Sequence, residues 1–161
     1  MLKLKTDAVK FKDDDYETQK ETLQSLLPFI KKYKIIYDPF YCQGTIKKYW
    51  EELGKECINE KLDAFNREHP KEYHIIISNI PFSIKKECIE LFFSLDKPFI
   101  ILMPIATMGS KWMSKYFDKL QFIVPHKRIN FLKNGKVGNG SWFDCCFYCY
   151  GLNLDKDIIK L

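Results

Sequence analysis

Short apolar runs alternate with segments of helical periodicity along most of the chain. The clearest apolar run covers residues 73–78, and we expect it to form a buried strand. Further strands are predicted at 34–37, 55–59, 99–103, 122–124, 129–132 and 142–150. Helices are predicted at 18–30, 45–53, 84–95 and 109–120. Continuous apolar strands that alternate with helices favour an α/β fold with a mostly parallel sheet covered on both faces.

The chain has 161 residues, which corresponds to one domain. We expect that domain to span residues 13–161, after a flexible, lysine-rich segment at residues 1–12. A composition of 46% hydrophobic and 29% charged residues excludes the disordered and fibrous classes. No apolar run is long enough for a membrane span, and the first residues lack the apolar core of a secretory signal. We therefore expect an intracellular chain, cytoplasmic or nuclear, with no membrane partner.

The net charge of +5 permits a nucleic-acid partner without requiring one. A compositional bias towards lysine would produce the same excess, and Arg67 and Arg128 are the only arginines. The six cysteines are expected to be reduced thiols. Three of them cluster at Cys145, Cys146 and Cys149, but no histidine or second cysteine pair completes a metal site. We expect this cluster to lie in the core of a strand.

Polar residues that follow the predicted strands are the first candidates for function, because ligands bind beyond the carboxyl ends of parallel strands. Asp38 follows the strand at 34–37, and Gly44 closes the loop after it. An acid in this place can hold an amino group, although the loop could equally be an ordinary connection. Glu60 follows the second strand and could accept hydrogen bonds from both hydroxyls of a ribose. The alternative is a solvated surface acid.

The sharpest candidate is Asn79-Ile80-Pro81-Phe82, after the strand at 73–78. The Asn79 side-chain oxygen and a nearby backbone carbonyl can both accept a hydrogen bond from an exocyclic amino group. The Phe82 ring can stack on a base that has swung out of its helix. The alternative is a structural turn in which Asn79 caps the helix at 84–95.

These segments together resemble the class I S-adenosylmethionine-dependent methyltransferases that modify adenine N6. Residues 79–82 resemble the Asn-Pro-Pro-Phe/Tyr catalytic motif of that family. Residues 38–44 resemble its Asp-Pro-Phe-x-Gly-x-Gly cofactor loop, and residues 15–19 with 26–28 resemble the segment that folds over the methionine end of the cofactor. Residues 127–131 and the closing aromatic strand are similar to the ends of phage- and virus-type members. The likeness extends from about residue 13 to residue 152.

The resemblance implies a Rossmann-like class I methyltransferase fold whose sheet has a reversed C-terminal strand. The short interval between Glu60 and Ile75 implies that the third strand of that fold and its helix are reduced or lost. The implied activity is methyl transfer from S-adenosylmethionine to adenine N6 in DNA or RNA, without a metal. The implied catalytic residues are Asn79, Ile80, Pro81 and Phe82. The implied cofactor-binding residues are Tyr16, Thr18, Asp38, Pro39, Phe40, Gly44, Glu60, Asp63 and Phe65.

Three residues depart from the family pattern. Cys42 replaces the first loop glycine, Ile80 replaces the first catalytic proline, and Gln19 replaces a proline near the N-terminus. We expect an active enzyme, because both acids, the asparagine and the stacking ring remain. Two other classes stay open: a non-catalytic subunit that binds nucleic acid or a partner methyltransferase, and an enzyme that methylates a protein amide.

No separate target-recognition domain is visible, so specificity would come from loops, from a partner protein, or hardly exist. The candidate loops are residues 104–115 and 134–141. Lys111, Lys115 and Arg128 are candidate phosphate contacts, and Trp112 is a candidate stacking residue. Solvated surface cations and a core tryptophan are the alternatives.

Overall fold

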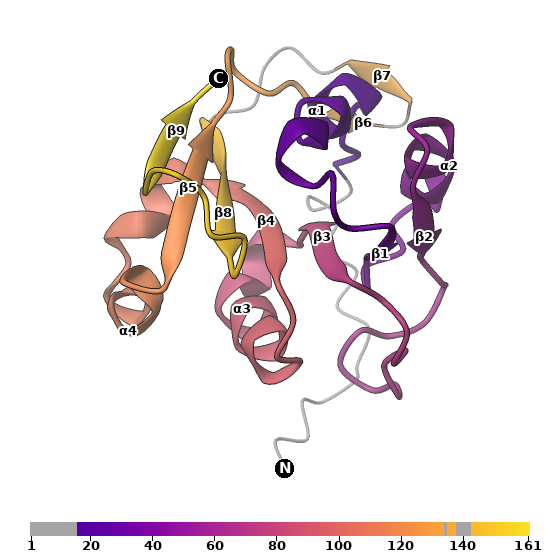
Figure 1. Cartoon of the computed structure of the whole chain (residues 1–161), viewed down its shortest axis with the longest axis horizontal. Coiled ribbons are helices and arrows are strands. Elements are labelled where there is room, and N and C mark those ends of the chain that lie inside the picture. Colours follow the sequence, from indigo (N-terminus) through magenta and orange to yellow (C-terminus); the bar gives the residue numbers. More distant parts are fainter. Residues whose placement is uncertain (1–15, 134, 138–142) are drawn as a thin grey trace.

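A seven-stranded sheet forms the centre of the molecule (Figure 1). The computed structural model describes residues 16–133, 135–137 and 143–161. Along the sheet the order is β2-β1-β3-β4-β8-β5-β9. Strand β8 is antiparallel to both of its neighbours, and every other neighbouring pair in this sheet is parallel. The strands are β1 (Ile35–Tyr37), β2 (Glu56–Ile58), β3 (Ile75–Asn79), β4 (Phe99–Pro104), β5 (Leu120–Val124), β8 (Cys145–Tyr150) and β9 (Ile158–Lys160).

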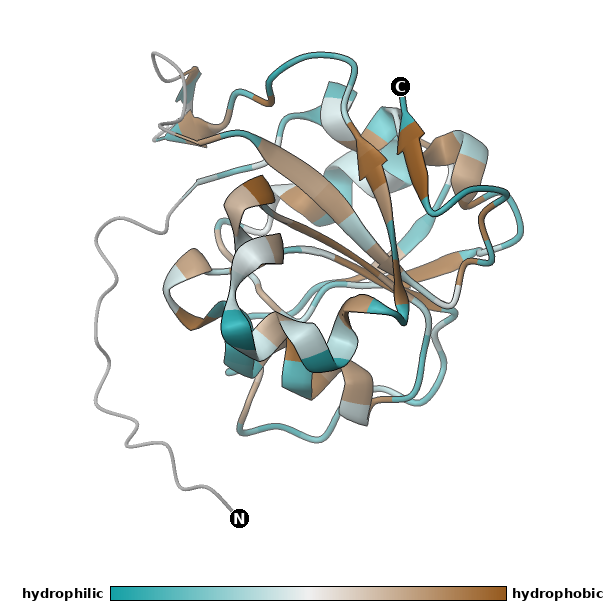
Figure 2. Ribbon diagram, turned by 90° about the vertical axis from the view of Figure 1, so that its left-hand side faces the viewer, coloured by the Kyte–Doolittle hydropathy of each residue, from teal (hydrophilic) through white to brown (hydrophobic). Residues whose placement is uncertain are grey.

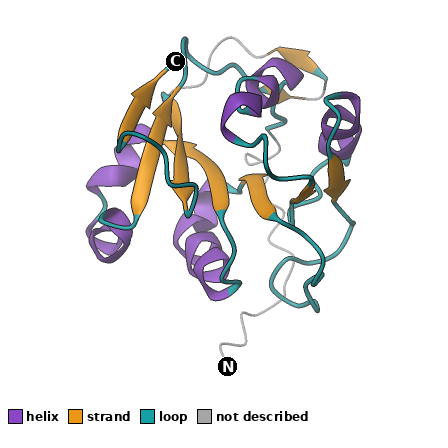
Figure 3. Cartoon of the chain, viewed as in Figure 1, coloured by secondary structure: helices purple, strands orange, loops and turns teal. Residues whose placement is uncertain are grey.

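Both faces of the sheet are buried, so alternate residues of a strand enter different cores. Ile100 and Leu102 of β4 pack in the core that includes residues of α1 (Lys20–Gln24) and α2 (Thr45–Glu52). Ile101 and Met103 pack in the core that includes residues of α3 (Lys85–Ser94) and α4 (Ser114–Phe117). The strands accordingly form a largely hydrophobic layer through the middle of the molecule (Figure 2), with helices on both of its sides (Figure 3).

This architecture confirms the predicted α/β class, the mostly parallel sheet and the reversed strand near the C-terminus. It also confirms the reduced third strand. Residues 59–74, which lie between β2 and β3 and are all described, contain no helix or strand, so β2 forms one edge of the sheet. The predicted flexible segment at residues 1–12 lies outside the described residues. In the part of the chain that is described, no helix is both long and apolar enough to cross a membrane.

The helix predicted at 18–30 is shorter than expected. Helix α1 ends at Gln24, and the 3-10 turn η1 (Leu27–Phe29) follows, because Pro28 has no N–H to continue an α-helix. The apolar face is nevertheless buried as predicted, with Leu23, Leu26 and Ile30 in the core.

The helix predicted at 109–120 is wrong. Two 3-10 segments, η3 (Ile105–Gly109) and η4 (Lys111–Met113), precede the single turn of α4, and β5 already begins at Leu120. Ser110 separates the 3-10 segments, since its backbone is extended, with φ −69° and ψ 134°. The apolar residues of this segment have helical spacing, but short 3-10 and α-helical turns bury them without forming one continuous helix.

The strand predicted at 129–132 is also wrong. Only β6 (Leu132–Lys133) pairs, and it forms a separate two-stranded ribbon with β7 (Lys136–Val137). Ile129 and Phe131 are buried, so their apolar character reflects loop residues that pack into the core. Of the candidate loop at 134–141, Gly135 forms the turn of this ribbon with φ +72°, and residues 134 and 138–141 lie outside the described residues.

Strand β9 was not predicted. It is only three residues long, too short to stand out as an apolar run; it pairs in parallel with β5, and its first residue, Ile158, is 63% exposed. The preceding loop is held by Gln121 of β5. The Gln121 Nε2 donates to the Leu154 carbonyl at 2.9 Å, and the Gln121 Oε1 accepts from the Leu154 amide at 2.8 Å. One side chain therefore anchors the chain that leads into β9.

Replacing Gln121 with Met should remove these hydrogen bonds while it keeps the side-chain length. We expect a loss of about 1–3 kcal/mol in the free energy of unfolding, because part-buried backbone groups of Leu154 lose their partners. Urea titration measures the change, and Gln24→Met at an exposed position of α1 is the matched control, expected within about 0.5 kcal/mol of wild type. Equal stability of the two variants would contradict the anchoring role.

Candidate active site

The carboxyl ends of three parallel strands meet at one edge of the sheet. Asp38 follows β1, Asn59 follows β2, and Asn79 ends β3. The Ser78 hydroxyl donates to Asp38 Oδ1 at 2.8 Å. The Asn59 Nδ2 donates to the carbonyl oxygens of Asp38, at 3.0 Å, and Phe40, at 3.1 Å. Side-chain hydrogen bonds therefore join all three strand ends.

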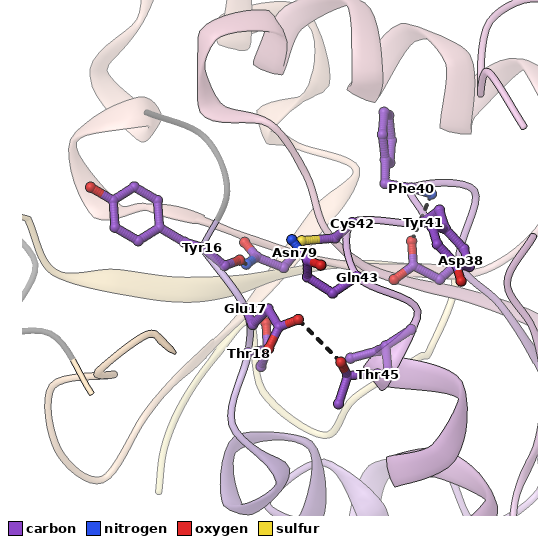
Figure 4. Close-up of a pocket in the computed structure, with 11 residues that line it drawn as sticks. Tyr16, Glu17, Thr18, Asp38, Phe40, Tyr41, Cys42, Gln43, Thr45 and Asn79 are labelled. Atoms are coloured by element: carbon purple, nitrogen blue, oxygen red, sulfur yellow. Dashed lines mark hydrogen bonds between the residues drawn. The ribbon is translucent and has the colours of Figure 1, made fainter. Parts of the chain in front are cut away.

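A narrow cavity of about 30 Å³ lies beside these strand ends (Figure 4). Five of the residues that line it were predicted from the sequence: Tyr16, Thr18, Asp38, Phe40 and Asn79. The other six lining residues were not named as candidate site residues. Glu17, Tyr41, Cys42 and Gln43 belong to segments that carry the family resemblance, and Thr45 and Ile46 begin α2. The structure thus brings the candidate cofactor acid, the candidate catalytic asparagine and the N-terminal segment to one place.

Asp38 is a buried carboxyl with neutral partners. It is 4% exposed, and it accepts hydrogen bonds from the Ser78 hydroxyl and, at 3.0 Å, from the Phe40 amide. Desolvation raises the pKa of Asp38 to about 7, against the opposing effect of these two hydrogen bonds. A buried acid that is held only by neutral donors is well suited to bind a cationic group such as an ammonium.

Asn79 presents an acceptor that no described residue uses. Its Nδ2 donates to the Tyr16 carbonyl at 2.9 Å, and only the nitrogen end of the amide can make that bond. The Oδ1 is buried and has no hydrogen-bond partner among the described residues. The predicted alternative, a helix cap, is wrong, because Ile84 occupies the N-cap position of α3 and no side chain caps that helix.

Residues 80–82 form the turn that leads from β3 into the 3-10 segment η2 (Phe82–Ile84). Ile80 is 3% exposed and packs with the residues of α3, so the departure from proline places an apolar side chain in the core. Pro81 has φ −63° and precedes the 3-10 turn. The half-buried Phe82 ring contacts Phe143 and Phe131 edge to face, with centroids at 5.3 Å and 6.3 Å. An aromatic cluster therefore follows directly after Asn79.

The N-terminal segment crosses the site and connects separate parts of it. Glu17 and Leu132 exchange two backbone hydrogen bonds of 2.8 Å, and the Glu17 carboxylate accepts from the Thr45 hydroxyl at 3.1 Å. Gln19, the third departure, donates from its Nε2 to the Asn130 carbonyl at 2.7 Å. Thr18 is 6% exposed, and within the described chain its hydroxyl has no partner. The segment thus adds a further unpartnered polar group to the cavity.

The loop after Asp38 keeps the backbone of the glycine-rich pattern despite its substitution. Cys42 has φ +50°, a left-handed conformation that costs a non-glycine residue about 1–2 kcal/mol. Gly44 has φ +75°, and a Cβ built there would lie 2.5 Å from the Tyr41 Oη. The Tyr41 side chain therefore packs directly on Gly44 and takes up space at the cavity.

The polar groups of the cavity fit a ligand with an ammonium and a carboxylate, the methionine end of S-adenosylmethionine. The buried Asp38 carboxyl matches the ammonium, and the unpartnered Thr18 hydroxyl can donate to the carboxylate. A volume of about 30 Å³ is far too small for a nucleoside.

The residues predicted to hold the nucleoside end do not line this cavity. Glu60 accepts from the Arg67 Nη2 at 2.7 Å. Asp63 stabilises its own turn, since its carboxylate accepts from the Phe65 amide at 2.9 Å. The Phe65 ring contacts Phe40, a cavity residue, at a centroid distance of 6.1 Å. Pro39 is buried and is not part of the cavity lining.

The predicted nucleic-acid contacts are spread over different elements. Lys111 is exposed on η4, and Lys115 is exposed on α4 with its Nζ 3.5 Å from Glu90. Arg128 is paired with Asp144, with its Nε 2.6 Å from the carboxylate. Trp112 is partly buried against the core around α3, which favours its packing alternative. Their role in binding nucleic acid stays a prediction.

The three clustered cysteines lie in the core of β8 as predicted. Cys145, Cys146 and Cys149 are buried, and burial raises the pKa of each thiol. Across residues 16–133, 135–137 and 143–161, no group of three or more histidine, cysteine or acidic side chains could hold a metal ion.

Three residues that hold the site together, Ser78, Asn59 and Arg67, were missed by sequence reasoning. Ser78 precedes the catalytic segment directly, and its contact with Asp38 follows from the parallel pairing of β1 with β3. Arg67 was noted only as one of two arginines. Its rarity was the one available signal, since nothing in the pattern around it indicates a contact with Glu60.

No protein-family model matches the sequence, and no curated protein matches it either. Among solved structures, the chain is similar to a candidate class I S-adenosylmethionine-dependent methyltransferase from Listeria monocytogenes, with a TM-score of 0.53 and 14% sequence identity. The match covers 89% of this chain, which spans 64% of the length of that chain. At this identity the likeness establishes the fold, and the chain has the Rossmann-like α/β fold of a class I methyltransferase.

Proposed function

We propose that this protein transfers a methyl group from S-adenosylmethionine to the N6 amino group of adenine in DNA or RNA. The observation that carries the proposal is the unpartnered Oδ1 of Asn79, which lies in the same cavity as the buried carboxyl of Asp38. One group can hold an amine and the other a cationic cofactor. Methylation of an exocyclic amine requires these two abilities side by side.

Bound S-adenosylmethionine supplies a methyl group that its positively charged sulfur has already activated. The residues of the chain then have to align the two reactants, and such positioning accounts for a large part of the barrier reduction in bimolecular reactions. Asp38 binds the ammonium of the cofactor, and Glu60 accepts from its ribose hydroxyls. Asp63 and Phe65 flank the adenine of the cofactor. The Phe65 ring contacts Phe40, which lines the cavity.

Asn79 and Ile80 orient the amine that is methylated. The Asn79 Oδ1 and the Ile80 carbonyl accept its two N–H groups, which leaves the nitrogen lone pair directed at the methyl group. Phe82 stacks on the base, which has to leave its duplex to reach the site. Formation of the new C–N bond would break the methyl–sulfur bond of the cofactor, so that S-adenosylhomocysteine is the leaving group and the methylated nitrogen loses one proton to water.

Nucleic acid is the proposed acceptor because the chain carries a net charge of +5, and because exposed Lys111 and Arg128 belong to segments that follow β4 and β5. These strands run parallel to β3, so their carboxyl ends lie at the edge of the sheet that holds Asn79. We propose that these segments, or a partner protein, recognise the target sequence.

A methyl-transfer assay with labelled S-adenosylmethionine tests the proposal directly. The acceptors are single- and double-stranded DNA and RNA oligonucleotides that contain adenine, and nucleoside mass analysis identifies the product. N6-methyladenine in one class of polymer supports the proposal and names the polymer. Label in a protein amide, or no transfer despite cofactor binding, would overturn the acceptor assignment. No cofactor binding would instead point to a non-catalytic subunit.

Replacing Asn79 with Ala should lower turnover by about 100-fold or more, because the amine loses an acceptor that orients it. The affinity for S-adenosylhomocysteine, measured by calorimetry, should stay within about threefold of wild type, a difference of less than 1 kcal/mol. Lys86→Gln, at an exposed position in the first turn of α3, is the control for local disturbance and should retain turnover. Undiminished turnover in Asn79→Ala would contradict the catalytic assignment.

The affinity for S-adenosylhomocysteine should rise as pH increases through about 7. Burial raises the pKa of Asp38 to about 7, so the carboxyl is neutral below this pH and becomes an anion, able to bind an ammonium, above it. Calorimetry across pH 5.5–8.5 in buffers of different ionisation enthalpy would detect the proton released on binding, and Asp38→Asn should abolish that release. A wild-type release that persists in Asp38→Asn would assign the titration to another group.

A further inference from the structure

We propose that Arg67 is a positioning residue, which fixes the Glu60 carboxylate for the hydroxyls of the cofactor ribose. The inference rests on the proposed function, because it takes Glu60 as the ribose-binding acid. It adds a second residue to that subsite, one that acts through Glu60 and does not touch the cofactor itself.

The two members of this ion pair are held very differently. The Arg67 Nη2 lies 2.7 Å from the Glu60 Oε2, but the Arg67 side chain is 8% exposed while the Glu60 side chain is 53% exposed. The Arg67 guanidinium also lies over the ring of Tyr37, 5.6 Å from its centroid. Arg67 is thus the fixed member of the pair, and Glu60 is the member that it holds.

The position of Arg67 follows from the missing third strand. Because β2 is the edge of the sheet, Glu60 lies just beyond the end of a strand that has a neighbour on one side only. Tyr37 belongs to β1, the neighbour that is present, and its hydroxyl also contacts the His69 Nδ1 at 2.8 Å. Tyr37 therefore connects the loop at 59–74 to β1. Arg67, which packs on Tyr37, holds the Glu60 carboxylate in place.

Folding stability alone does not account for the pair. The Arg67 Nη1 is buried without a partner among the described residues, and such a donor costs free energy. The ion pair with the half-exposed Glu60 carboxylate adds little to the free energy of unfolding, since exposed ion pairs contribute little to stability. Orientation of a ligand-binding acid does account for it, because a carboxylate fixed in advance loses less side-chain entropy when the ligand binds. The ion pair uses one lone pair of Oε2, so Oε1 and the second lone pair of Oε2 stay available to the two ribose hydroxyls.

Calorimetric titration with S-adenosylhomocysteine and with its 2′-deoxy and 3′-deoxy analogues tests the inference. Wild type should bind the parent compound about 10- to 100-fold more tightly than either analogue, the range for hydrogen bonds to a charged group. Arg67→Met keeps apolar bulk over Tyr37. It should reduce this preference to about threefold or less, while affinity for the analogues changes little and the melting temperature stays the same or rises.

Three further variants separate positioning from a structural role. Arg67→Lys keeps the charge without the planar fork and should show an intermediate preference. In a Glu60→Gln background, Arg67→Met should have no further effect on the preference. Lys34→Met removes the exposed Lys34–Glu56 pair, 3.3 Å long, at the same edge of the sheet and should behave as wild type.

Each remaining outcome decides a different point. Equal weakening of all three ligands in Arg67→Met, or a lowered melting temperature, would show that Arg67 supports the loop and would overturn the inference. A wild-type protein that binds all three ligands equally would overturn the ribose role of Glu60, and the inference with it. A wild-type protein that binds none of them would overturn the proposed function itself.

Discussion

The hydrogen bond from the Ser78 hydroxyl to the Asp38 carboxyl connects the ends of two neighbouring parallel strands, and the site is built around it. Because β3 continues from Ser78 directly into Asn79, the register between β1 and β3 sets the position of the amide acceptor relative to the acid. Burial of this carboxyl raises the pKa of Asp38, against the opposing effect of the hydrogen bond. The N-terminal segment then reaches the site through the amide of Asn79. The hydrogen bonds of Asp38 and Asn79 thus connect the strands and also position the polar groups of the candidate site.

The sequence was informative where burial on both faces of the sheet dictates an apolar run. The strands β3, β4 and β8 and the acids and amide at strand ends follow from that constraint. It was uninformative where apolar residues pack from irregular backbone. Ile129 and Phe131 are as buried as strand residues but belong to a loop, and the segment after Gly109 forms short turns. Strand β9 depends on Gln121, whose contact with Leu154 spans 33 residues and leaves no local pattern.

Because the third strand is absent, the residues that follow β2 are held by side-chain contacts and not by a neighbouring strand. Asn59 holds the backbone of the loop after β1, and Arg67 holds Glu60 against Tyr37. Both contacts link segments that no periodicity connects, which explains why sequence reasoning identified the two acids but not the residues that hold them. In this shortened fold, side chains therefore hold the polar groups at the strand ends where a neighbouring strand is absent.

The place of β8 in the sheet has a consequence for how the protein is made. β8 lies between β4 and β5 and pairs with both, yet the ribosome synthesises it after both of them. Until β8 emerges from the exit tunnel, the apolar edge of β4 has no partner, and an unpaired edge of this type readily joins strands of other chains. The cysteine-rich strand β8 closes the gap between β4 and β5. The nascent chain is therefore most prone to aggregation in the interval between the synthesis of β4 and that of β8.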